Sequence, residues 1–229
     1  MDEPLVSVRG ESVAEGEPEL AEVGVSVGAR DKSRDETLRR LDERSRAVLA
    51  LLAAAGDAVE RVETDNVRIG PEFKDGKPNE RIAGYSAAVR HSVTVTDFTV
   101  LGDLVARLAE LEMVHVSGPW WRLRPGSAHY RAARVAAARD AVTRAKEYAE
   151  ALGTRVTGLV ELADSGLLSE AVAAPSARVM SPMAMAPAAM SRATAAPEPV
   201  SLDLEPVRQL VRASVEARFR LAPPPAETW

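Results

Sequence analysis

The stretch that decides the fold is Ser127 to Gly153, SAHYRAARVAAARDAVTRAKEYAEALG. It is rich in alanine, arginine, lysine and glutamate, which are strong helix formers. Ser127 occupies the position of an N-cap, and Gly153 occupies the position that follows a last helical turn, so the two residues mark the ends of one long helix. At about 1.5 Å per residue this helix would be roughly 40 Å long.

One face of this helix carries mainly alanine. The residues that share the face at steps of three and four are Val135, Ala138, Val142, Ala145, Ala149 and Leu152. Because alanine is short, such a stripe lets the helix lie close to its neighbour. We expect that neighbour to be a β-sheet.

The sequence on both sides of the helix predicts strands through the alternation of apolar and polar residues. The alternation is clearest at 19–27 and at 81–96, where valine recurs at every second position. A short strand is predicted at 5–10, followed by a polar turn region at 11–18. Further strands are predicted at 62–73, at 113–124 with a bulge at Gly118-Pro119, at 154–163 and at 206–221.

Two shorter helices are predicted between these strands. Ser33 and Glu36 have the spacing of a capping box, and the helix that they start is closed by Gly56. Asp97 caps the second helix, whose inner face is lined with leucine. From residue 19 to residue 124 the predicted order is β-α-β-β-α-β. This order is that of the split βαβ, ferredoxin-like arrangement.

The predicted fold class is therefore α+β: an antiparallel sheet with a ferredoxin-like core, the long third helix packed on the sheet, and further C-terminal strands. Residues 1–164 and 206–222 are expected to form a single domain. Residues 165–205, rich in alanine, proline and methionine, are interpreted as an insertion that is flexible or ordered by a partner. Residues 223–229 are a tail.

Composition excludes several classes of function. The chain has 229 residues, a formal net charge of -5 and no cysteine. The acidic balance argues against a nucleic-acid binder, and disulfides, thiolate catalysis and cysteine-based zinc sites are excluded. The sequence has neither an apolar run long enough for a membrane span nor, in MDEPLVSVRG, a signal peptide pattern. As written, the protein is expected to be cytoplasmic.

Four features, in this order and spacing, resemble the SIMPL domain family. They are Val6 to Glu11 followed by Pro18 to Ala21; Gly84 to Ala87 leading into Val93 to Asp97; Val116 to Gly118 before an aromatic-Leu strand; and the alanines of the long helix with Lys146 and Leu152-Gly153. The alanines concerned are Ala132, Ala136, Ala141, Ala145 and Ala149. The similarity covers roughly residues 6 to 162, together with the final strand.

The resemblance implies an α+β fold and self-assembly, in some members into large ring-like oligomers. Bacterial members are mostly exported and are linked to envelope function and oxidative stress. The resemblance supplies no catalytic residues. This sequence departs from the family in its lack of a visible signal peptide and in its methionine- and proline-rich insertion.

Several residues are candidates for binding or contact. Met180, Met183, Met185 and Met190 could form a soft site for Cu(I) or scavenge oxidants, although a flexible linker explains them more simply. Trp120 and Trp121 are expected on opposite faces of one strand. The outward indole, together with Phe219 on the last strand, is interpreted as part of an oligomer interface.

Other polar residues are interpreted as ordinary surface or core groups. The three histidines, His91, His115 and His129, lack the spacing of a metal site. A basic group, Arg122, Arg124, Arg131 and Arg134, could hold an anion near the start of the long helix but is more simply a solvated face. No catalytic motif is visible.

The sequence thus predicts a non-enzymatic, homo-oligomeric protein without cofactors, whose partner is itself or an unidentified protein. The alternative is a metal-binding (copper) or oxidant-scavenging protein that uses the methionines. A third hypothesis is an enzyme with a pocket between the long helix and the sheet.

Overall fold

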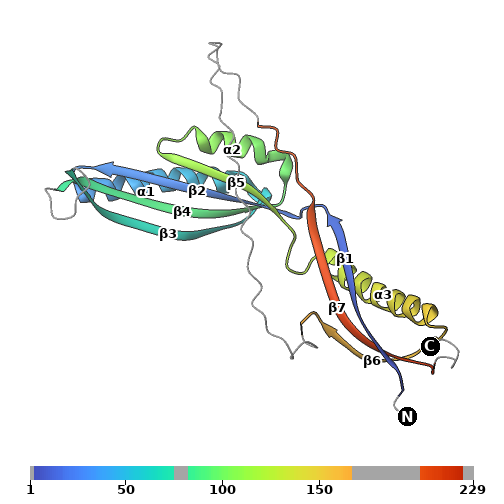
Figure 1. Cartoon of the computed structure of the whole chain (residues 1–229). Coiled ribbons are helices and arrows are strands. Elements are labelled where there is room, and N and C mark those ends of the chain that lie inside the picture. The colour runs from blue at the N-terminus through green and yellow to red at the C-terminus, as the bar shows by residue number, and fades with distance from the viewer. Residues whose placement is uncertain (1–2, 75–81, 167–201, 224–229) are drawn as a thin grey trace, which may run out of the picture. The chain divides into compact units, whose positions relative to one another are not determined.

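The computed structural model describes residues 3–74, 82–166 and 202–223. Within them lie three α-helices and seven strands, arranged in a four-stranded and a three-stranded sheet (Figure 1). The α+β class with antiparallel sheets is confirmed. Most of the predicted insertion, 167–201, and the tail residues 224–229 lie outside the described residues.

Contacts within the chain group its residues into two compact units. Of the described residues, 17–74, 82–125 and 202–209 form the larger unit, and 3–16, 126–166 and 210–223 form the smaller. Alternation and helical periodicity alone predict one domain over 1–164 and 206–222. The smaller unit combines residues from both ends of the chain, and local sequence patterns carry no signal for such a combination.

The larger unit has the predicted order β-α-β-β-α-β. Its elements are β2 (Leu20–Asp31), α1 (Arg34–Ala54), β3 (Val59–Phe73), β4 (Ile82–Val95), α2 (Leu101–Ala109) and β5 (Val114–Arg122), with short 3-10 turns at Gly56–Ala58 and Phe98–Val100. The strand order β3-β4-β2-β5, with each neighbouring pair antiparallel, is compatible with the ferredoxin-like arrangement.

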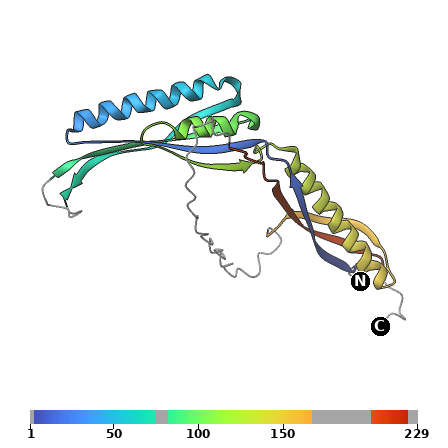
Figure 2. The ribbon, with the colours of Figure 1, turned by 90° about the horizontal axis from the view of Figure 1, so that it is seen from above.

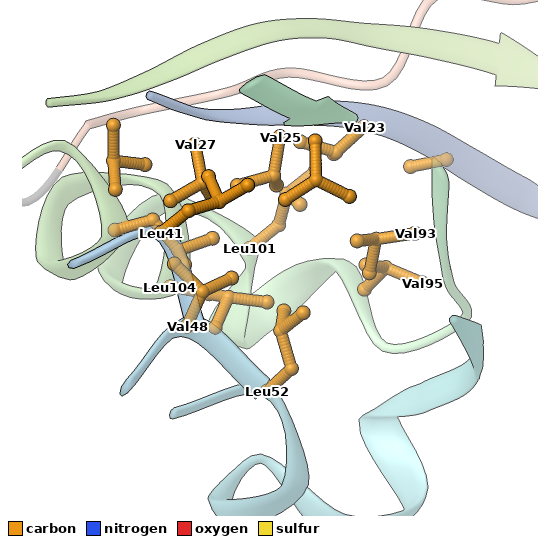
Figure 3. Close-up of a cluster of buried hydrophobic side chains, with 14 of the residues drawn as sticks. Val23, Val25, Val27, Leu41, Val48, Leu52, Val93, Val95, Leu101 and Leu104 are labelled. Atoms are coloured by element: carbon orange, nitrogen blue, oxygen red, sulfur yellow. The ribbon is translucent and has the colours of Figure 1, made fainter. Parts of the chain in front are cut away.

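The core of this unit lies between one sheet face and the two helices. Helices α1 and α2 lie on the same face of the four-stranded sheet (Figure 2). Val23, Val25 and Val27 of β2 are buried, and they point toward leucines and valines of α1 and α2 (Figure 3). The residues between these valines therefore lie on the opposite, open face of the sheet, because successive strand side chains alternate.

Helix α1 begins where predicted, but the capping box is wrong. The side chain of Ser33 makes no capping hydrogen bond. The backbone carbonyl of Ser33 accepts hydrogen bonds from the backbone N–H and the hydroxyl of Thr37, at 3.0 and 2.8 Å. Glu36 is instead engaged by Arg39 and Arg40, which follow it by three and four residues. These ion pairs hold the carboxylate on the helix surface and away from the helix start.

The second helix and the strand after it form largely as predicted. Asp97 accepts a hydrogen bond from the backbone N–H of Thr99 at 2.9 Å and caps the turn that leads into α2. The register of β5 on β2 shifts between Glu22 and Gly24, opposite Gly118-Pro119, which confirms the predicted bulge.

The smaller unit is built from β1 (Leu5–Gly16), α3 (Ala128–Ala151), β6 (Val156–Asp164) and β7 (Gln209–Leu221), with strand order β1-β7-β6. The predicted end of this strand at Gly10, followed by a turn, is wrong, because β1 continues to Gly16. A Cβ on Gly10 would lie 2.1 Å from the carbonyl oxygen of Ala137. The glycine therefore marks the point where the helix backbone meets the strand.

Helix α3 lies on a sheet, as expected, and its caps are confirmed. Ser127 accepts from the backbone N–H of His129, and Gly153 has a φ of 67°. The sheet that it covers is the three-stranded sheet of the smaller unit (Figure 1). The prediction that all three helices cover one sheet is therefore wrong.

The predicted inner face of α3 is partly wrong. The buried residues are Ala133, Ala137, Ala141, Ala145 and Ala149. Ala145 and Ala149 were predicted, and Ala138, also predicted, is half-buried against the same core. Val135, however, is 41% exposed, and Val142 and Leu152 are also exposed. Every buried residue follows the previous one by four positions, and such a row is inclined to the helix axis. The prediction assumed a stripe parallel to the axis.

Candidate functional site

The adjacent indoles point to opposite sides of β5. Trp121 packs on the core of the larger unit, where its ring meets Phe98 edge-to-face with ring centroids 4.9 Å apart. Trp120 lies on the open face, opposite Glu22 on β2, and is 44% exposed. Trp120 is therefore available to a partner, whereas Trp121 is a core residue.

Phe219, the other predicted interface residue, is in the interior of the smaller unit. It belongs to the cluster in which Ala137, Ala141 and Ala145 of α3 meet β1 and β7. Because its ring is buried within its own chain, its packing supports the position of α3. The four methionines proposed for copper, Met180, Met183, Met185 and Met190, lie outside the described residues.

The histidines do not form a metal site. His91, 3% exposed, faces α1, and its Nε2 and Nδ1 lie 3.3 and 3.2 Å from the hydroxyls of Ser45 and Thr64. His115 is on the opposite face of the same sheet, and His129 belongs to the smaller unit. Within the ranges that the structure describes, no three histidine, aspartate or glutamate side chains gather in a metal-binding group.

The contact between Ser45 and His91 resembles a nucleophile and its base. Burial lowers the pKa of His91, and the charge of Asp65 opposes this effect. The imidazole lies between α1 and the sheet, so a substrate would reach it only if the helix opened. We interpret His91 as a neutral core histidine that satisfies two hydroxyl groups.

The predicted basic group is divided between the two units. Arg122 forms an ion pair with Glu22 at 2.6 Å, and Arg124 binds Glu60, whose pKa it lowers. Arg131 and Arg134 are exposed on α3. Since Arg122 and Arg124 already have carboxylate partners, a solvated surface explains them better than an anion site.

The outer edge of β6, with which no other strand of the described residues pairs, is a candidate contact surface in the smaller unit. Only Val156 of this strand packs on the core, while Leu159, Val160 and Leu162 are 57%, 42% and 51% exposed. Leu159 lies opposite Phe219 and Leu162 opposite Ala217 in the antiparallel register. Opposed residues share a face, so both leucines extend the helix-covered face beyond the area that α3 covers.

A second candidate surface is the open face of the four-stranded sheet. Small residues of three neighbouring strands, among them Gly28, Gly70 and Ala88, line a hollow of about 450 Å³. Arginines border it, and Met113, which directly precedes β5, and His115 of β5 line its other side. The sequence did not predict this hollow. The available signal was the small side chains at the outward positions of 24–28 and 86–88.

A family model described as SIMPL, "Protein of unknown function (DUF541)", matches residues 6–219. The chain belongs to the SIMPL family. The match extends beyond the range on which the resemblance was based and takes in elements of both units. No curated protein matches the sequence. Family membership therefore identifies the type of protein, and its function has to be argued from the two candidate surfaces. None of the helices in the described ranges could cross a membrane.

Proposed function

We propose that this SIMPL-family protein is a non-enzymatic interaction protein that assembles with further copies of itself, and that β6 supplies a subunit contact. The observation that carries the proposal is the exposed apolar edge of β6. An edge strand presents unpaired backbone N–H and C=O groups, and natural proteins usually protect such edges with charges, prolines or a cover. β6 instead shows consecutive exposed apolar residues, Leu159 and Val160.

A second copy of the chain is the occupant that best fits this edge. In a two-fold dimer the same surface meets itself, so an antiparallel β6–β6 pair is self-complementary. With the axis at Leu159, each Leu159 would meet its counterpart, and Leu162 would lie opposite Val156. Glu161, which lies 3.8 Å from Arg218 of its own chain, would then face Thr157 and avoid a like charge.

The absence of catalysis is part of the proposal. It is supported by the burial of His91, the histidine in contact with a serine hydroxyl. A link to envelope function or oxidative stress rests on the family resemblance alone.

Light scattering at micromolar concentration tests the assembly. The parent protein is expected to give a mass of at least a dimer, and Leu159→Lys combined with Val160→Lys is expected to lower that mass. The control is Leu49→Lys on α1, which replaces a residue exposed to a similar extent at a site away from the strand edges. A monomeric parent, or an edge variant that assembles like the parent, would refute the role of β6.

A further inference from the structure

The open face of the four-stranded sheet has an unusual floor. Gly28 of β2, Ala88 of β4 and Arg68 of β3 are directly opposed across three strands, and Arg30, Ser86 and Gly70 form the next such row. The outward positions of a solvated antiparallel sheet normally carry longer polar side chains. Here small side chains on neighbouring strands leave the hollow of about 450 Å³ open to solvent.

A neighbouring hollow on the same face shares part of this lining. It measures about 190 Å³ and is bordered by Ser26, Asn66 and Arg90. Arg68 and Ala88 line both hollows. Arg68 therefore stands between two concave regions, where its guanidinium can reach a molecule lying in either.

The glycines of β2 decide where the long side chains lie. A Cβ on Gly24 would come within 2.7 Å of Nη2 of Arg90, so this guanidinium lies across the central strand above Gly24. A Cβ on Gly28 would meet only Met113, at 3.4 Å from its Cε and 3.6 Å from its carbonyl oxygen. Arg90 is thus directed away from the larger hollow, which keeps an aliphatic floor with one flexible thioether beside it.

The charges around the hollows are unequally compensated. Arg30 pairs with Glu72 at 3.0 Å, and Arg90 lies 3.7 Å from Asp65. Arg68 has no carboxylate within ion-pair distance among residues 3–74, 82–166 and 202–223. The lining therefore carries an excess positive charge, although the chain as a whole has a net charge of -5.

We infer that the larger hollow binds a small organic anion, with its carboxylate or phosphate group on the guanidinium of Arg68 and its apolar body over Gly28 and Ala88. A guanidinium donates two parallel hydrogen bonds to either anion. The hollow has the volume of a small-molecule site, and an apolar floor with few polar groups is the usual composition of such sites. This binding is independent of the proposed assembly through β6.

Ligand-observed NMR on the full chain tests this inference at constant ionic strength. The probes are benzoate, which combines a carboxylate with an apolar ring, and inorganic phosphate, which carries charge alone. Benzoate is expected to bind saturably and more tightly than phosphate, because only benzoate covers the aliphatic floor. If phosphate binds more tightly, the site recognises the anion by its charge alone, and the assigned contact with the apolar floor is wrong.

Two variants and one control locate the site. Arg68→Gln is expected to weaken benzoate binding at least about tenfold, as the loss of a charge-assisted pair implies. Ala88→Leu keeps every charge but fills the floor and is also expected to abolish binding. Arg61→Gln, on the same strand and beside Glu63, should bind like the parent.

Other results would also overturn the inference. They are the absence of saturable binding of either probe by the parent, equal affinities of Arg68→Gln and Arg61→Gln for benzoate, and a change of assembly mass in Ala88→Leu when the parent binds neither anion. The last result would show that the open face is a contact between copies of the chain.

Discussion

Gly10 of β1 lies directly against the backbone of α3 at Ala137: a Cβ on the glycine would lie 2.1 Å from the alanine carbonyl oxygen. The clash would involve the helix backbone, which cannot rotate away as a side chain can. The buried row of alanines on α3, Ala133 to Ala149 at every fourth position, thus depends on the glycine of β1. A larger residue on either side would overlap with its neighbour.

Gly10→Ala is therefore expected to destabilise the protein by at least about 1–3 kcal/mol, the range for overpacking a close contact. The helix must move off β1 to accept the methyl group. The matched control is Gly158→Ala on β6, where an added Cβ meets nothing within 4 Å. Urea denaturation followed by circular dichroism compares the two. Equal midpoints would mean that the helix does not rest on Gly10.

The buried ridge of α3 predicts opposite outcomes for neighbouring residues. Ala141→Leu should lower the free energy of unfolding by about 1–3 kcal/mol, because the fully buried methyl group of Ala141 faces the sheet and leaves no room for a larger side chain. Val135→Ala should change the free energy of unfolding by less than about 0.5 kcal/mol, as is usual for surface substitutions. Urea denaturation measures the unfolding free energies of both variants. A larger loss in Val135→Ala than in Ala141→Leu would show that the inner face predicted from the sequence is correct.

Burial lowers the pKa of His91, so the folded protein binds a proton there less readily than the unfolded chain. Between the folded pKa and the ordinary value of about 6.5, the unfolded state holds more protons, and stability rises with pH. We expect the unfolding free energy to fall as pH drops through this window. His91→Gln should flatten the profile, because it removes the group whose pKa differs between the two states. A parent profile that is flat below pH 6.5 would contradict the assignment.

The two indoles of β5 should respond differently to truncation. Trp121→Ala removes the edge-to-face contact with Phe98 and opens a partly buried site, which should cost about 2–4 kcal/mol. Trp120→Ala should leave the stability of the isolated subunit within about 0.5 kcal/mol. Thermal melts of both variants at low protein concentration provide the comparison. A similar loss in both would place Trp120 in the core as well.

Local patterns were sufficient for most element boundaries. Asp97 caps the turn before α2, and Ser127 and Gly153 mark the two ends of α3. Alternating valines mark β2 and β4. Each of these signals acts within a few residues. The capping box at Ser33 failed for a local reason too. Glu36 has two arginines within one turn, and they compete for its carboxylate.

The candidate surfaces required the strand registers. Nothing in the sequence places Arg68 opposite Ala88 and Gly28, since these residues come from three separate strands. The exposure of Leu159 likewise depends on how far α3 covers the sheet. The outward position of Trp120 was predictable, because adjacent residues on a strand always face opposite ways.

By itself, the sequence determined the α+β class, the helix ends and the alternating faces of the strands, since periodicity and capping are short-range properties. Only the tertiary structure decided that β1, α3, β6 and β7 form a unit apart from 17–125, and which alanines of α3 are buried. Both depend on close packing between segments far apart in the chain, where a single glycine hydrogen in place of a methyl group sets the distance between a helix and a strand.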